Sequence, residues 1–110
     1  MRQGTTPTYT LTVSGYDLTD KTVYVAVSSR AKRIIKSGDA LSMAYGDGAT
    51  SIVFGLSQEE TLALSLGPAE VQVRFIDSDG VAKATDIQQI MVDRVLQPGV
   101  IVYQGGGDDA

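Results

Sequence analysis

Hydrophobic residues alternate with polar ones along most of this chain, and this period of two constrains the fold more than any other feature. From Thr8 to Val13, threonines alternate with a tyrosine, a leucine and a valine. Successive side chains of a β-strand point to opposite faces of a sheet, so this pattern predicts a strand with one buried face. A helix would need a period of about 3.6 instead. The chain is therefore expected to be all-β.

Further strands follow the same logic. The stretch from Thr22 to Val27 is almost wholly apolar, which is typical of a central strand covered on both faces. Ala31 to Lys36 is patterned more weakly and predicts a third strand. Two hairpins are clearer, because alternating segments flank Gly46-Asp47-Gly48 and Asp77-Ser78-Asp79-Gly80, and tight turns favour aspartate and glycine. A last strand is expected around residues 90–92.

One segment breaks the alternation. Ser57-Gln58-Glu59-Glu60 has the capping-box pattern, in which a serine is followed three residues later by a glutamate. Gly67-Pro68 closes this piece, so it predicts a turn or two of helix that crosses between two sheets. Neighbours on a helical turn point about 100° apart, so Glu59 and Glu60 are not expected to share a proton. We assign Glu60 to the cap and Glu59 to solvent.

About seven short strands and one helical crossover indicate an immunoglobulin-like two-sheet sandwich, with a small closed barrel as the alternative. The chain has no Cys and no Trp, so the likeness to antibody domains is one of architecture only. Its 110 residues fit one domain. We expect an ordered core over about residues 6–102 and flexibility in residues 1–4 and 104–110, which have little to bury.

The composition excludes several classes of chemistry. Without His or Cys, the chain has no Ser-His or Cys-His nucleophile pair and no zinc site of the usual ligands. We therefore expect no enzymatic activity and no cofactor, and binding of a small molecule is not favoured. A net charge of −4 argues against a nucleic-acid partner. No apolar run reaches the ~18 residues of a membrane span, and no signal peptide is recognisable. We expect synthesis in the cytoplasm and no membrane partner.

Two groups of charged residues remain as candidate sites. Asp77-x-Asp79-Gly80 begins like a calcium loop, although Gln88 stands where an EF-hand needs its bidentate glutamate. The alternative is ordinary turn chemistry, which we favour. The second group is a cluster of positive charges, Arg30, Lys32, Arg33 and Lys36.

In an extended strand, Arg30, Lys32 and Lys36 would share one face, with Arg33 on the other. We favour a solvated edge strand, where cationic side chains discourage unwanted pairing. The alternative is an electrostatic contact with an acidic partner, such as a neighbouring copy of this protein.

Several stretches, in their order and spacing, resemble a family of small structural proteins encoded among the virion genes of tailed phages and prophages of Firmicutes. The resemblance covers about residues 4–101. The blocks are Gly4-Thr5-Thr6-Pro7-Thr8-Tyr9-Thr10, Leu56-Ser57-Gln58-Glu59-Glu60-Thr61-Leu62, Val71-Gln72-Val73-Arg74 with Asp77-Ser78-Asp79-Gly80, and Val95-Leu96-Gln97-Pro98-Gly99-Val100-Ile101.

This resemblance implies an immunoglobulin-like sandwich that acts in virion assembly, in the tail, baseplate or head–tail region, without enzymatic activity. The implied partners are other virion proteins and copies of the same chain. Made in the cytoplasm of a bacterial host, the protein would be assembled into the virion. The sequence departs from the family pattern at Ala31 to Lys36 and in its Gly-Asp tail. An immunoglobulin-like adhesion or carbohydrate-binding module is the alternative function.

Overall fold

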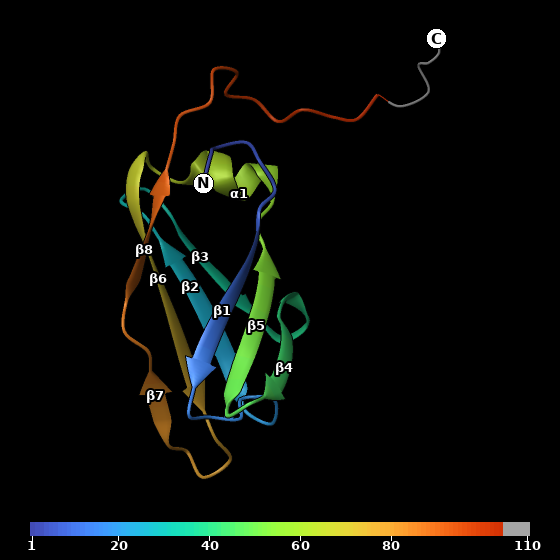
Figure 1. Cartoon of the computed structure of the whole chain (residues 1–110). Coiled ribbons are helices and arrows are strands. Elements are labelled where there is room, and N and C mark those ends of the chain that lie inside the picture. The colour runs from blue at the N-terminus through green and yellow to red at the C-terminus, as the bar shows by residue number, and fades with distance from the viewer. Residues whose placement is uncertain (105–110) are drawn as a thin grey trace.

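The computed structural model describes residues 1–104, which form eight strands in two antiparallel sheets (Figure 1). The strands are β1 (Thr8–Ser14), β2 (Thr22–Ser28), β3 (Arg33–Ser37), β4 (Ser42–Gly46), β5 (Ala49–Gly55), β6 (Gly67–Ile76), β7 (Ala82–Ala84) and β8 (Gln88–Val92). A 3-10 turn (Gly38–Ala40) follows β3, and the helix α1 (Gln58–Ala63) joins β5 to β6.

The strand order is that of an immunoglobulin-like Greek key. One sheet has the order β1-β5-β4, and the other runs β3-β2-β6, with β7 and β8 both paired to β6. These strands occupy the places of B-E-D in one sheet and C′-C-F-G in the other. The chain changes sheets through α1, so the predicted sandwich and its helical crossover are confirmed. Among residues 1–104, no strand occupies the place of strand A beside β1.

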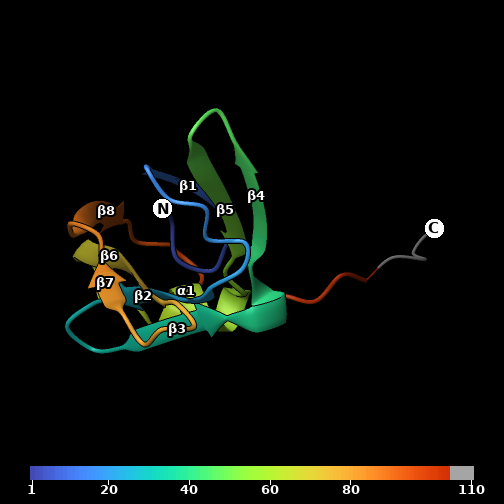
Figure 2. The same cartoon turned by 90° about the horizontal axis from the view of Figure 1, so that it is seen from below.

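The core lies between the two layers, which are separated in the view of Figure 2. Alternation places the buried side chains of both sheets on their facing sides. These include Val13, Val23, Val25, Val27, Ile34, Ile52, Phe54, Val71, Val73 and Phe75. Strand β2 is central in its sheet, as expected, but it is not covered on both faces. Tyr24 remains 45% exposed, because no described layer packs on the outer face of the five-stranded sheet.

The turns form as their residues predict. Asp47 and Gly48 have positive φ angles of 54° and 77°, the geometry of a type I′ turn between β4 and β5. In the second hairpin, Asp77 Oδ1 accepts hydrogen bonds from the backbone N–H groups of Asp79 and Val81, each at 3.0 Å. The Asp77 carboxylate, the first of the candidate calcium loop, thus accepts hydrogen bonds from the backbone of its own turn.

The capping box at α1 is also confirmed. Ser57 accepts from the Glu60 N–H through its hydroxyl, and the Glu60 carboxylate accepts from the Ser57 N–H. The buried side chain of Thr61 connects α1 to the N-terminal residues of the chain. Its Oγ1 accepts from the Gly4 N–H at 2.9 Å and lies 2.9 Å from the Thr5 carbonyl oxygen.

Residues 1–4, for which the sequence predicts flexibility, form hydrogen bonds with distant parts of the chain. Arg2 forms a parallel bridge with Asp93, just beyond β8. The Gln3 N–H donates to the Asp93 carbonyl at 3.0 Å, and the Asp93 N–H donates to the Met1 carbonyl at 2.7 Å. Sequence periodicity cannot show this pairing, because it joins residues about 90 positions apart. Of residues 104–110, only Gln104 is described.

Candidate interaction surface

The basic residues predicted as a partner contact do not all lie on one strand or on one side of it. Arg30 and Lys32 lie in the loop between β2 and β3, because the strand begins only at Arg33. Arg33 faces outward beside Ser28, whereas Lys36 lies on the same side of β3 as buried Ile34. The prediction that Arg30, Lys32 and Lys36 share a strand face is therefore wrong. The edge position of β3 is confirmed.

Lys36 has an intramolecular role instead. Its Nζ lies 2.9 and 2.8 Å from the two carboxylate oxygens of Glu60, which joins β3 to α1. Burial alone would raise the pKa of Glu60. The hydrogen bonds from Lys36 and from the Ser57 N–H outweigh that effect and hold the pKa below its ordinary value. Lys36 is thus engaged within the fold and is not a free contact residue.

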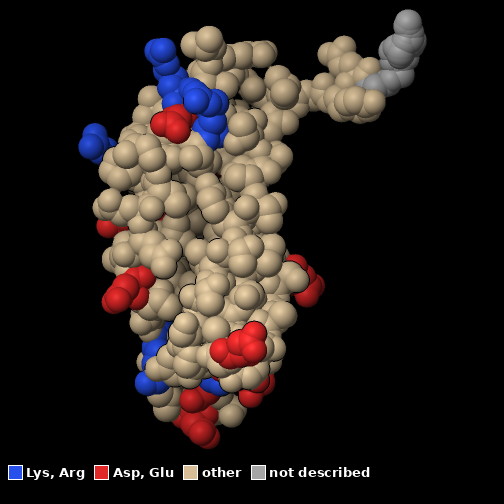
Figure 3. Space-filling model, in the orientation of Figure 1, with Lys and Arg blue, Asp and Glu red and all other residues tan. Residues whose placement is uncertain are grey.

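The outer side of the three-stranded sheet is free of charge, and we call it the uncharged face. Every side chain that its strands direct outward is small. These residues are Thr8, Thr10, Thr12, Ser14, Ser42, Ala44, Gly46, Ala49, Ser51, Val53 and Gly55. Figure 3 shows this side of the molecule, where Lys, Arg, Asp and Glu lie toward the ends and margins. Depletion of charged residues is what distinguishes the centre of protein interfaces from other surface.

Strand β1 borders this face and leaves one side of its own backbone unpaired. The Leu56 N–H donates to the Pro7 carbonyl, and the Gly15 N–H donates to the Gly48 carbonyl. In an antiparallel strand, the N–H and C=O of one residue both point to the same neighbouring strand, and the direction alternates along the strand. In β1, the backbone groups of the odd-numbered residues therefore point to β5. The backbone groups of the even-numbered residues point away from β5 and have no backbone partner among residues 1–104. We call them the β1 free edge: Thr8, Thr10, Thr12 and Ser14.

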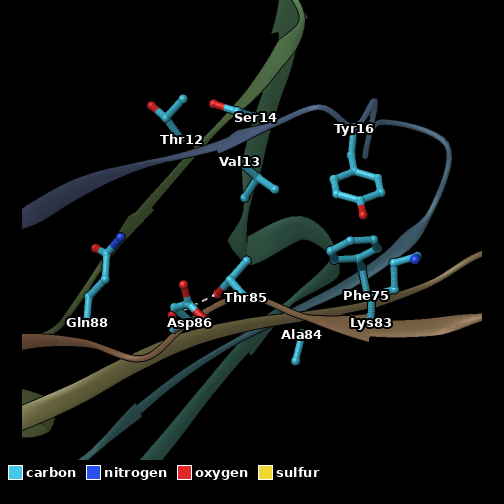
Figure 4. A pocket seen from close by; sticks show the side chains of 10 residues that line it. All are labelled: Thr12, Val13, Ser14, Tyr16, Phe75, Lys83, Ala84, Thr85, Asp86 and Gln88. Carbon is cyan, nitrogen blue, oxygen red and sulfur yellow. Dashed lines mark hydrogen bonds between the residues drawn. The ribbon is translucent and has the colours of Figure 1, made fainter.

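A groove opens beside this edge, between β1 and the β6–β7–β8 side of the other sheet (Figure 4). Val13 points into it from β1. The rings of Tyr16 and Phe75 pack with their centroids 5.1 Å apart, and the Lys83 ammonium lies 5.8 Å from the Tyr16 ring centroid. The hollow measures about 540 Å³, against about 30 Å³ for one water molecule in the liquid. We call it the β1 groove.

The chemical character of the β1 groove suits an extended chain. Apolar and aromatic side chains meet threonine and serine hydroxyls there, and the free backbone groups of β1 lie alongside. Within residues 1–104, no group of three His, Asp, Glu or Cys side chains is placed to hold a metal ion. The arrangement therefore favours backbone pairing and side-chain packing.

The sequence interpretation concentrated on charge and missed this surface. A signal for it was present, because the outward positions of the three strands are all small and uncharged. Neither a protein-family model nor a curated protein sequence matches the chain. No helix in residues 1–104 is long and apolar enough to span a membrane.

Proposed function

We propose that the protein is a non-enzymatic structural or assembly component of the virion of a tailed phage or prophage, acting through protein–protein contacts. One observation carries this proposal: the uncharged face and the β1 free edge adjoin on the same strand. Together they offer a flat surface that needs little desolvation and a row of backbone groups ready for pairing. Assembled particles depend on such repeated contacts.

The position of the phage-like blocks supports the proposal. Gly4 and Thr5 of the first block meet Thr61 of the second. Gln58, also in the second block, pairs with Ile101 of the last. The residues that carry the resemblance therefore tie distant segments together at the α1 end. This is expected if the blocks encode an architecture rather than a reaction.

Mass spectrometry of virions purified from a strain that expresses the chain tests the proposal. We expect the chain to be present in a fixed ratio to the other virion proteins. Its consistent absence from purified particles, while it accumulates in the cell, would overturn the assignment.

A pair of variants locates the contact. Ser51→Lys places a charge at the centre of the uncharged face, on the middle strand β5. Gln89→Lys places the same charge at an exposed position of β8 and serves as the control. We expect the first variant to lose incorporation into particles and the second to keep it. Equal incorporation of both variants would show that the uncharged face is not the contact surface.

A further inference from the structure

Within residues 1–104, strand β1 lacks the neighbour that its place in the fold normally has. An immunoglobulin-type sheet continues from strand B to strand A, and β1 occupies the place of B. The preceding residues do not fill the gap, because Arg2 and Gln3 pair with Asp93 on the other sheet's side. The β1 free edge is therefore a vacant strand position with the β1 groove beside it.

The same chain carries a segment that belongs to no strand and is suited to that position, Val95–Gln104, which we call the tail segment. It contains no charged residue, and Val100-Ile101-Val102-Tyr103 consists of strong β-formers. Val102 and Tyr103 are 75% and 93% exposed. Figure 1 shows the tail segment leaving the body of the domain beyond β8. The apolar residues from Val100 to Tyr103 are thus exposed and lie outside the core.

One contact shows how the backbone of this segment is satisfied. The side-chain amide of Gln58 accepts from the Ile101 N–H and donates to the Ile101 carbonyl, both at 2.8 Å. A neighbouring strand would make the same pair of hydrogen bonds. Beyond Ile101, the described residues as far as Gln104 have no hydrogen-bond partner among residues 1–104.

We propose that residues Val100–Gln104 of one copy add as a strand to the β1 free edge of a second copy. The added strand would take the place of strand A, and its alternate side chains would enter the β1 groove beside Val13 and Tyr16. This inference deepens the proposed function, on which its role in a particle rests, by naming a second copy of the chain as one partner. Neither β1 nor residues Val100–Gln104 carry a charge that pairing would have to desolvate, and the two charged residues of the β1 groove, Lys83 and Asp86, come from its other wall.

The geometry favours a second copy over the chain's own tail. Gln58 anchors Ile101 at the α1 end, whereas the groove lies beside Thr12 to Tyr16, toward the opposite end of β1. The donor and acceptor surfaces differ, so the contact is head-to-tail and leaves one free donor and one free acceptor on every pair. Such contacts repeat into rings or filaments.

Two variants block the two halves of the contact separately. Thr12→Pro removes an outward N–H from β1 and leaves the hydrogen bonds to β5, since proline is tolerated on edge strands where the N–H faces solvent. The double variant Val100→Asp, Val102→Asp places charges in the tail segment and leaves β1 intact. Far-ultraviolet circular dichroism establishes that each is folded. If Thr12→Pro does not fold, Thr10→Lys, whose side chain stays in solvent, replaces it.

Sedimentation velocity over a wide range of concentration tests the proposal. We expect wild type to form concentration-dependent oligomers and each variant alone to remain monomeric. Mixing the two variants should restore a dimer, because one keeps the donor and the other keeps the acceptor. A monomeric wild type, or a mixture that remains monomeric, would overturn the proposal. Dimers that survive the tail substitutions would assign the edge to pairing of β1 with β1 and would also overturn it.

The outcomes for particles are separate. A chain that is monomeric in solution but present in virions would overturn this inference alone. A chain that self-associates through the tail segment but is absent from virions would overturn the proposed function alone.

Discussion

Strands β1 and β3 each form the outer edge of a sheet, but their sequences treat that position in opposite ways. Strand β3 carries the outward-facing Arg33 and follows a loop with two more cations, Arg30 and Lys32. Such charges oppose the addition of another strand. Strand β1 is longer, with seven residues against five, and has no charge, proline or glycine. The difference indicates that one edge is protected against pairing and the other is left open to it.

The largest expected effect separates the two sides of β1 itself. Leu11→Pro removes an N–H that points to β5 and disrupts a partly buried position, so we expect it to lower the free energy of unfolding by about 3 kcal/mol or more. Thr12→Pro, one residue away, should cost less than about 1 kcal/mol, because its N–H faces solvent. Urea unfolding followed by circular dichroism measures both. Similar losses would mean that the outward side of β1 is not free.

The support beneath the β1 groove gives the next effect. Buried Thr50 accepts from the Leu18 N–H at 3.0 Å and donates to the Tyr16 carbonyl at 2.8 Å. The nearly isosteric change Thr50→Val leaves both groups unpaired, and we expect a loss of about 2 kcal/mol. Amide hydrogen exchange should quicken in residues 15–21 and stay unchanged in β3. Equal quickening at β3 would show that the two edges are not independent.

At the β3 side, Glu60→Gln should cost about 1 kcal/mol, because it weakens both the capping box and the ion pair with Lys36. The folded-state pKa of Glu60 lies below its ordinary value of 4.5. Its contribution is therefore complete above about pH 4.5 and is lost as the pH falls through the folded-state pKa.

Urea unfolding of wild type and Glu60→Gln across this pH range checks the point. The difference in the free energy of unfolding between wild type and Glu60→Gln should be constant near neutral pH and should become smaller in acid. A difference that widens as the pH falls would contradict the assigned direction of the pKa shift. Glu59→Gln is the matched control, because it neutralises an exposed neighbour and leaves the capping box and the ion pair in place.

The smallest effect is expected in the basic loop. Arg30→Glu with Lys32→Glu should change the free energy of unfolding by no more than about 0.5 kcal/mol, since both side chains are exposed and carry no ion pair within residues 1–104. The variant should also self-associate like wild type, because β3 does not take part. Loss of self-association would instead support the basic cluster around Arg30 and Lys32 as the partner contact.

Sequence patterns predicted what local chemistry determines. Alternation identified β1, aspartate and glycine identified the turn at Asp47, and the spacing of Ser57 and Glu60 identified the helix cap. These features depend on residues a few positions apart. The fold class followed from their number and order.

The features that the sequence did not predict depend on residues distant along the chain. The bridge from Arg2 to Asp93 and the ion pair from Lys36 to Glu60 both join separate elements. The tyrosine at position 24 favours a strand whether or not it is buried, so the sequence does not reveal its exposure. Tyr24 is exposed because no described layer covers that face of the sheet. Likewise, the uncharged face exists only once three strands are aligned in register.

Hydrogen exchange of individual amides in dilute and in concentrated solution tests the comparison of the two edges most directly. By the same alternation, the outward backbone groups of β3 belong to Arg33, Ile35 and Ser37. We expect the amides of the β1 free edge to exchange rapidly in dilute solution and to become protected as concentration rises, while those three stay rapid throughout. Concentration-dependent protection at β3, or none at the β1 free edge, would contradict the account.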